Sequence, residues 1–461
     1  MLAPFQFKRL EDKILITNDF GEYEYLTKED FKDLINNNIS SDHVLYESLE
    51  AKGFLYSTSV EAYLDKFKHN LRAGKSFVFS STSLHIFVVT NYCNGQCVYC
   101  QAQSSVEKCN DRMSEEIAKK AVDLALQSPQ QTLDFEFQGG EPLSNFDIIK
   151  FIVEYAEQKR GKKNINYSIV TNLTMLTDDK LKYIIDNNIS ISVSIDGPKD
   201  LHNQNRPLAG GVQSYDKVFK NIRKLKDCNY QFGAIQTTTR YSLAYSKEII
   251  DEYVNNQLHN VFIRPLTSLG VASDQWNEIG YTPEEFVEFY KKCIDYILEL
   301  NINGYYLVEG HAAILLSKIL NGIGTNYMEL RSPCGAAIGQ IAYYHDGNVF
   351  TCDEGRMLYE MGDDSFCLGS LFDDDYNSLM DSKLCKTVCR YSIVESLPGC
   401  CDCVYQPYCG TCPVINYALE KDAVSRKRFN DRCQIFQGML DYIFIKLQNS
   451  KYEEVFYSWV K

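Results

Sequence analysis

Residues 90–100 read TNYCNGQCVYC, and this stretch decides the fold. Its three cysteines, Cys93, Cys97 and Cys100, have the spacing C-x3-C-x2-C. Three thiolates on one short loop can hold three irons of a cubane iron–sulfur cluster and leave the fourth iron open to a small molecule. The alternatives are a zinc knuckle and a chance grouping, but zinc prefers four closed ligands with paired C-x2-C spacing. The loop therefore predicts an iron–sulfur site with one open position.

Composition narrows the classes of partner and the compartment. The 461 residues are 45% hydrophobic and carry a net charge of −14, which argues against nucleic acid or an anionic membrane as the main partner. We recognise no signal peptide and no apolar run of about 18 residues, so we expect a cytoplasmic protein without a membrane span. Most of the 17 cysteines lie between Cys334 and Cys433, and in such a compartment this clustering predicts metal ligation rather than disulfides.

Strands and helices are expected to alternate over residues 83–270. The predicted strands, each followed by a helix except the last, are 84–90, 134–137, 167–171, 189–195, 233–238 and 261–266. Such a series implies an α/β fold with a parallel sheet and right-handed crossovers. Six units predict a partial (β/α)6 barrel that is open on one side. Ligands bind at the carboxyl ends of barrel strands, and the cysteine loop follows the first of these strands.

Four further segments flank this barrel. Residues 1–75 should form a unit with strands at 13–17 and 22–26, a helix capped by Thr27, and a second helix at about 41–52. We expect a helical bridge at 271–333, a cysteine-rich domain at 334–433, and a C-terminal helix with a tail at 434–461. In the bridge, Thr282, Pro283 and Glu285 form a capping box that opens a long helix. The last helix is predicted at about 431–449 and closes the chain.

The first unit is similar to the winged-helix modules that hold the leader of a ribosomally made peptide. The alternative is a generic extension that packs on the core. Strands followed by two short helices carry the likeness, and no single motif residue does.

Glycine and polar motifs end the next strands. They are Gly139-Gly140-Glu141 after the second strand, Thr171-Asn172 after the third, and Ser194-Ile195-Asp196-Gly197-Pro198 with Arg206 after the fourth. Because glycine has no Cβ, backbone carbonyls at such a motif can approach a ligand closely. Alone, Gly-Gly-Glu is also compatible with an ordinary tight turn, and Arg206 with a surface salt bridge.

Taken with the cysteine loop, these motifs resemble the radical S-adenosylmethionine (SAM) enzymes. The resemblance implies that Gly139, Gly140 and Glu141 bind the amino group of SAM, and that Thr171 and Asn172 contact its sugar. It implies that Ser194 contacts the ribose or methionine part and that Arg206 pairs with the SAM carboxylate. It also implies that Tyr99 lies against adenine or packs over the cluster. It also implies that a reduced [4Fe–4S] cluster cleaves SAM to a 5′-deoxyadenosyl radical, which abstracts hydrogen from unactivated carbon.

The cysteine-rich domain carries a second pattern. Asp346-Gly347 predicts a hairpin that brings Cys334 and Cys352 together. Further on, Cys400, Cys403, Cys409 and Cys412 have the spacing C-x2-C-x5-C-x2-C, and Cys433 follows. This resembles the SPASM domain of peptide-modifying radical SAM enzymes, and the alternative is two zinc ribbons. The resemblance implies two auxiliary [4Fe–4S] clusters, one on Cys334, Cys352 and Cys412 and one on Cys400, Cys403, Cys409 and Cys433.

Two departures from that domain leave one ligand open. The last spacing is one residue shorter than usual, and 335–341 holds no fourth cysteine for the first set. Candidates for that place, besides a substrate thiolate, are Cys367, Cys385, Cys389 and Cys401. Cys109, Cys228 and Cys293 are predicted to be ordinary thiols.

One carboxylate is a candidate catalytic residue. Asp353 matches the general base of sulfatase-maturing relatives, with Glu354 and Arg356 as neighbours in the same cavity. A carboxylate that merely ends the hairpin is equally compatible with the sequence.

The resemblance covers 83–433 and is most like the His-Xaa-Ser system radical SAM maturase. It implies an enzyme that forms a carbon–carbon, carbon–oxygen or thioether crosslink within a ribosomally made precursor peptide. It further implies a reductant such as ferredoxin or flavodoxin, and a second radical SAM maturase as a partner. The alternatives are an anaerobic sulfatase-maturing enzyme that makes formylglycine, a peptide epimerase with Cys228 or Cys293 facing the cavity, and an iron–sulfur electron-transfer or scaffold protein.

Overall fold

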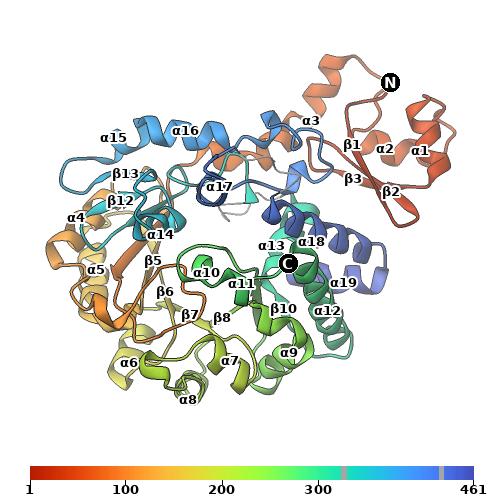
Figure 1. Ribbon diagram of the computed structural model, residues 1–461. Helices are drawn as coiled ribbons and strands as arrows, with labels where there is room; N and C mark the ends of the chain where they lie inside the picture. The colour runs from red at the N-terminus through yellow and green to blue at the C-terminus, as the bar shows by residue number, and fades with distance from the viewer. Residues whose placement is uncertain (323–329, 425–429) are drawn as a thin grey trace.

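The computed structural model describes residues 1–322, 330–424 and 430–461 (Figure 1). The predicted segments 271–333 and 334–433 thus each contain a stretch outside the described residues. Among the described helices, none combines the length and apolar character that crossing a bilayer requires.

Six parallel strands form the centre of the molecule, as the apolar runs predict. They are β4 (Leu84–Thr90), β5 (Thr132–Gly139), β6 (Asn164–Thr171), β7 (Ser190–Ser194), β8 (Gly233–Thr237) and β9 (Asn260–Arg264). The helices between them are α4 (Glu115–Ala125), α5 (Phe146–Lys159), α6 (Asp178–Asp186), α7 (Lys199–Asn205), α8 (Tyr215–Asp227) and α9 (Ser246–Asn255). Ser114 caps α4 and Thr177 caps α6 by accepting a backbone N–H with the side-chain oxygen. The α/β fold class is confirmed.

The sheet does not stop at these six strands. Short β10 (Val308–Glu309) extends it beside β9, while β11 (Gln340–Tyr343), β12 (Asn348–Phe350) and β13 (Cys367–Ser370) extend it beyond β4. The predicted hairpin is β11–β12, with Gly347 at φ 97° in its turn. Because β11 pairs in parallel with β4, the cysteine-rich domain is joined to the barrel by one continuous ten-stranded sheet. Buried His85 and Tyr343 join the two strands by a 2.8 Å hydrogen bond.

The N-terminal unit has three antiparallel strands followed by three helices. They are β1 (Gln6–Leu10), β2 (Lys13–Thr17), β3 (Tyr23–Leu26), α1 (Lys28–Ile35), α2 (Tyr46–Ala51) and α3 (Val60–Gly74). The sequence prediction was wrong in placing the second helix from residue 41, and it missed β1 and α3. Half of β1 faces water, so β1 lacks the apolar signal of a core strand. Residues 41–45 form turns instead of helix because Ser40 bonds Asp42 and accepts the His43 N–H through its carbonyl.

The C-terminal half is mostly helical. Its helices are α10 (Val271–Asp274), α11 (Trp276–Ile279), α12 (Pro283–Ile302), α13 (Gly310–Asn321), α14 (Asp353–Glu360), α15 (Tyr376–Asp381), α16 (Lys383–Tyr391), α17 (Pro413–Glu420), α18 (Asp431–Leu447) and α19 (Ser450–Trp459). The capping box of Thr282 and Glu285 is present at α12. The expectation that one helix closes the chain was wrong, because Asn449 caps a further helix, α19.

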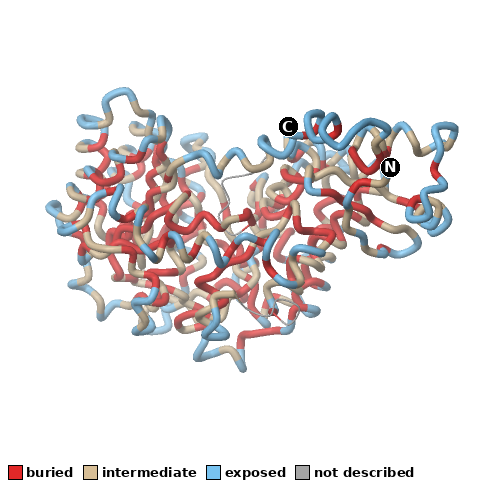
Figure 2. Tube along the Cα trace, turned by 90° about the horizontal axis from the view of Figure 1, so that it is seen from above, coloured by how far each residue is buried: buried red, intermediate tan, exposed pale blue. Residues whose placement is uncertain are grey.

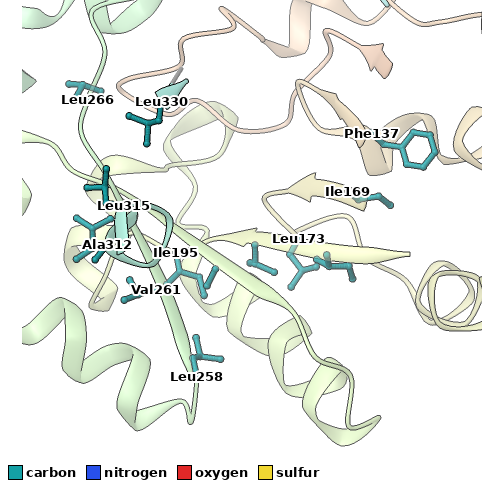
Figure 3. Packing of buried hydrophobic residues seen from close by; sticks show 14 of the residues in the cluster. Phe137, Ile169, Leu173, Ile195, Leu258, Val261, Leu266, Ala312, Leu315 and Leu330 are labelled. Atoms are coloured by element: carbon teal, nitrogen blue, oxygen red, sulfur yellow. The ribbon is translucent and has the colours of Figure 1, made fainter. Parts of the chain in front are cut away.

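The core lies between the sheet and its helices. Buried segments follow the central strands in Figure 2, whereas the N-terminal unit projects to one side with a small core of its own. Figure 3 shows Ala312 and Leu315 of α13 close to Val261 of β9. This packing closes the β9 end of the sheet and leaves the carboxyl edge to the functional loops.

Candidate functional site

The cysteine loop is clamped at the carboxyl end of β4. Backbone bonds tie it to the segment after α7, from Gln96 N–H to Pro207 O (2.7 Å) and from Val98 N–H to Asn205 O (3.0 Å). The Gly95 N–H donates to Cys93 Sγ at 3.2 Å, and an ideal Cβ on Gly95 would lie 3.3 Å from Cys93 Sγ and 3.8 Å from Cys97 Sγ. A side chain at position 95 would therefore press on the Cys93 thiol by a few tenths of an ångström, while its contact with Cys97 would be an ordinary one.

The three thiols of the loop lie near one another. Burial raises the pKa of Cys93, and the neighbouring Cys97 and Cys100 add to the rise. Burial also raises the pKa of Cys97 to about 11, although Arg206 opposes it. Such thiols stay protonated until a metal displaces the proton, and three convergent sulfurs suit an iron–sulfur cubane. The donor set fits the cluster that the spacing predicts.

The Gly-Gly-Glu turn touches the cysteine loop itself. An ideal Cβ on Gly139 would lie 2.0 Å from Thr90 O, and one on Gly140 would lie 2.2 Å from Tyr92 O. The N–H groups of Gly140 and Glu141 donate to these carbonyls at 2.9 and 2.8 Å. The close approach that the sequence predicts is therefore made by the chain's own backbone, while the SAM amino group as a partner of this turn stays a prediction.

Glu141 joins the ends of two strands. Its fully buried carboxylate accepts hydrogen bonds from Leu143 N–H (3.1 Å), Thr171 Oγ1 (2.6 Å) and Asn172 N–H (2.9 Å). Burial raises the Glu141 pKa and these donors oppose the rise. The Asn172 amide reaches Asn94 Oδ1 at 3.1 Å and lies 3.9 Å from Cys93 Sγ. Predicted SAM-binding residues are thus brought to the cysteine loop, but Glu141 and Thr171 are bonded to each other.

Arg206, Tyr99 and Asp196 form a buried network beside the loop. The Tyr99 hydroxyl donates to Asp196 Oδ2 at 2.7 Å, and Arg206 Nη1 lies 3.8 Å from Asp196 Oδ1 and also contacts the Tyr99 hydroxyl. Burial raises the Asp196 pKa, and Arg206 counteracts it. Arg206 therefore forms a buried ion pair with Asp196. The predicted SAM-contacting residue Ser194, at the end of β7, is half-buried. Sequence reasoning gave Asp196 no role, because its partners are distant along the chain.

The first set of C-terminal cysteines converges. Cys334, Cys352 and Cys412 are all buried and share one apolar cluster with Val388 and Ile415. Burial raises the pKa of Cys352, and Cys412 and Cys334 are among the charged neighbours that raise it further. The hairpin and the start of α17 thus bring the three cysteines into one neighbourhood, and their binding of a cluster stays a prediction.

The second set converges as well. Burial raises the pKa of Cys403 to about 11 and that of Cys409 to about 12, and Cys433 and Cys400 raise both. Gln437 donates to Cys433 Sγ at 3.3 Å from the next turn of α18. Four thiols at this place match the ligand number of a closed cubane.

The remaining cysteines have other hydrogen-bond partners or stand at the surface. Cys385 and Cys389 are free thiols on α16 that form a hydrogen bond with each other. The Cys401 thiol donates a hydrogen bond to Asp402 at the surface, and the Cys367 thiol donates one to Gly369 O at 3.6 Å. Cys228 is exposed at the end of α8, and Cys293 on α12 contacts Ser246 O at 3.7 Å. Cys228 thus lies at the C-terminal end of α8 and Cys293 on α12, and the epimerase alternative stays a prediction.

Asp353 begins α14 directly after Cys352. Its Oδ1 accepts from Arg356 Nε at 2.7 Å, and Arg356 is 1% exposed. Arg356 also interacts electrostatically with Cys100 of the cysteine loop. Helix α14 therefore extends from the first C-terminal cysteine set to the cysteine loop of the barrel. Asp353 raises the pKa of Glu136 on β5, where burial is the larger cause. Glu136 was missed, although Asp134, Glu136 and Gln138 alternate with apolar residues along that strand.

A cavity of about 610 Å³ adjoins the barrel's carboxyl edge, between residues 265–268 and the start of α18. Its walls include Trp276, Tyr281 and Phe436, together with the carboxylates of Glu420 and Asp431. Gln101, next to the last loop cysteine, donates to Thr267 O at 3.2 Å. The cavity and the cysteine loop therefore share one wall.

The fold and the loop chemistry agree with comparisons to known proteins. The family model of the Radical SAM superfamily matches residues 87–243. A protein of Methanocaldococcus jannaschii without an assigned activity is 35% identical over 221 residues, which are 48% of this chain and 71% of that protein. The chain belongs to the radical SAM superfamily. Membership implies an enzyme that uses SAM and a [4Fe–4S] cluster.

Radical SAM maturases are among the relatives. The cysteine-type anaerobic sulfatase-maturating enzyme of Clostridium perfringens is 24% identical over 380 residues, covering 80% of this chain and 97% of that enzyme. The radical SAM cyclopropyl synthase TigE of Paramaledivibacter caminithermalis is 24% identical over 359 residues, covering 74% and 70%.

Solved structures share the fold. AdoMet-bound anSMEcpe has a TM-score of 0.69 at 22% identity and covers 81% of this chain and 99% of that one. Streptococcus suis SuiB bound to its precursor peptide SuiA has a TM-score of 0.55 at 16% identity and covers 92% and 97%.

Proposed function

We propose that this radical SAM enzyme modifies a ribosomally made precursor peptide and forms a crosslink within it. The observation that carries the proposal is the position of Asp353, at the start of α14 and directly after Cys352 of the first C-terminal cysteine set. Arg356, which is ion-paired with Asp353, interacts electrostatically with Cys100 of the cysteine loop. A base at that place can take a proton from a substrate. A cluster held by Cys334, Cys352 and Cys412 would supply an electron acceptor beside it.

The cofactors proposed are SAM and three [4Fe–4S] clusters. Cys93, Cys97 and Cys100 would hold the first, Cys334, Cys352 and Cys412 the second, and Cys400, Cys403, Cys409 and Cys433 the third. When bound, the SAM-associated cluster supplies hydrogen abstraction from unactivated carbon. The chain's own residues orient the base and shield the loop. Arg356 holds the Asp353 carboxylate in place, and the buried network of Arg206, Asp196 and Tyr99 packs beside the cysteine loop.

The N-terminal unit supports a peptide substrate. Its sheet is tied to the cysteine-rich end by Thr17 Oγ1 to Val404 O (2.7 Å) and by Tyr408 OH to Gly21 O (2.9 Å). A peptide held by this unit would therefore stay at a fixed distance from the second cluster set. A precursor-peptide substrate also agrees with the shared fold of SuiB, which is bound to its precursor peptide SuiA and covers 92% of this chain. A reductant such as ferredoxin or flavodoxin, a second radical SAM maturase as a partner, and a cytoplasmic setting complete the proposal.

The second candidate function is formylglycine formation. It is favoured by Asp353 and by the sulfatase-maturating relatives, of which one is matched over 97% of its length. In that case the substrate would be a sulfatase segment with one cysteine or serine.

Anaerobic reconstitution followed by SAM and dithionite tests the proposal. We expect about twelve irons per chain and 5′-deoxyadenosine that a Cys93/Cys97/Cys100→Ala variant no longer makes. Peptides encoded beside the gene should then lose two hydrogens and gain a linkage that tandem mass spectrometry cannot fragment. An aldehyde trapped by a hydrazine reagent on a sulfatase peptide would instead establish formylglycine formation. Bound zinc with no SAM cleavage would contradict both.

A further inference from the structure

Two buried basic side chains lie near the C-terminal cysteine sets. Lys318 on α13 is 7% exposed and Arg331 is 4% exposed. Both line one cavity of about 60 Å³, which Cys409 and Lys75 also line. The Arg331 guanidinium stacks on Phe77 at 4.7 Å from the ring centroid, and it leaves no room for a side chain at Gly339. Packing therefore holds the charge of Arg331 in place.

Neither cation has a carboxylate partner among the described residues. The nearby groups that favour the charged form are Cys409 for Lys318, and Cys334 and Cys389 for Arg331. The other two buried arginines of the site differ, because Arg206 faces Asp196 and Arg356 faces Asp353. Burying a charge without a counter-charge is costly.

Free thiols do not meet this need. A free cysteine thiol is mostly protonated at neutral pH and carries no charge that could offset a buried cation. Iron ligation would deprotonate the cysteines and place negative charge beside both cations. Cys409 belongs to the four-cysteine set and Cys334 to the three-cysteine set, so each set has one cation.

We propose that Lys318 and Arg331 are the counter-charges of the two auxiliary clusters and raise their reduction potentials. Lys318 acts on the cluster of Cys400, Cys403, Cys409 and Cys433, and Arg331 acts on the cluster of Cys334, Cys352 and Cys412. The inference rests on the auxiliary-cluster assignment of the proposed function. Its sign is electrostatic: a reduced cluster carries one more negative charge, which a nearby cation stabilises.

The test is an EPR-monitored redox titration of the full chain, reconstituted anaerobically in the Cys93/Cys97/Cys100→Ala background that removes the loop cluster. Signals are assigned with Cys400→Ser and Cys334→Ser. We expect Lys318→Met to lower the reduction equilibrium constant of the second cluster at least tenfold, which is 59 mV for a one-electron couple, and to affect the first cluster less. Arg331→Met should show the reverse pattern.

Charge-conserving variants separate charge from packing. Lys318→Arg and Arg331→Lys should stay within about threefold of the parent, and so should Lys224→Met, which removes a lysine paired with Asp178 on the outside of the barrel. Iron lost in the methionine variants and restored in the charge-conserving ones would also support the proposal. Iron lost in both kinds of variant would overturn it in favour of a packing role.

Two further outcomes also decide. Unchanged potentials in Lys318→Met and Arg331→Met at full iron content would overturn this inference and leave the clusters standing. A parent chain without iron beyond the loop cluster would overturn the auxiliary clusters and this inference together.

Discussion

A methyl group at Gly140 is the smallest change expected to take the cysteine loop apart. Its Cβ would lie 2.2 Å from Tyr92 O and 3.0 Å from Cys93 Cβ, both held by the backbone of the loop. Gly140→Ala should destabilise the fold by about 2–3 kcal/mol through overpacking and lower the iron bound at the loop. Urea unfolding and an iron count per chain measure the two effects.

Gly74→Ala is the matched control. Gly74 ends α3, and an added Cβ meets nothing within 4 Å. It should leave both the iron content and the unfolding midpoint at the parent values. Full iron in Gly140→Ala would mean that the loop can move away from the turn, contrary to the clamped geometry.

The sequence predicted the kind of residue at this site better than its contacts. Gly139 and Gly140 indicated close approach, but the approaching group is the loop backbone, and only the folded chain brings Thr90 and Tyr92 there. Asp196 stood in a quoted motif without a role, because its importance comes from Tyr99 and Arg206, which fold against it. The cysteines were easier to predict, since their chemistry is fixed by spacing.

At the scale of elements, the join between β4 and β11 should make the fold sensitive to acid. Burial lowers the pKa of His85 to about 3, and the same cause lowers that of His202 to about 3. Below the ordinary pKa of 6.5 the unfolded chain takes up protons that the folded one refuses. The stability from the neutral histidines is therefore complete above pH 6.5 and is lost as the pH falls toward 3. Within this pH range each histidine lowers the free energy of unfolding by about 1.4 kcal/mol per pH unit of acidification.

His85→Gln separates this effect. The variant should be less stable at pH 7, because the bond to Tyr343 is weakened, yet its stability should fall less steeply between pH 6 and 4. Anaerobic urea unfolding at several pH values measures the slope. His69→Gln, at an exposed position on α3, should keep the parent slope. An unaltered slope in His85→Gln would mean that the strand pair opens before the ring titrates.

Elements with strong local signals were predictable and those defined by distant partners were not. The six barrel strands carry buried apolar residues in a run, as in β4, or at alternate positions, as in β5 and β6. The capped helices begin where Ser114, Thr177 and Thr282 stand. By contrast, the parallel pairing of β11 with β4 joins residues about 255 positions apart. The sequence placed the hairpin in a separate domain, because no local pattern records which strand it will meet.

The whole molecule places the N-terminal unit against the cysteine-rich end (Figure 1). Within β1, Gln6 and Lys8 face inward, to Cys401 O at 2.9 Å and to Asp441 at 2.6 Å. Phe7 faces the other way, is 58% exposed, and packs on Phe31 with 4.9 Å between ring centroids. Among the described residues β1 pairs only with β2, so its outer edge can accept an added strand.

If the precursor peptide docks on this unit, the substitution Phe7→Asp should weaken peptide binding. We expect peptide affinity to fall about tenfold, the loss of one aromatic contact, while SAM cleavage without peptide stays unchanged. Fluorescence anisotropy with a labelled peptide measures the affinity. Val44→Asp changes another exposed apolar residue of the same unit, 89% exposed in the connection between α1 and α2, and should bind as the parent does. Equal affinity in all three chains would move recognition to the 610 Å³ cavity beside the cysteine loop, because that is where aromatic walls and carboxylates next meet.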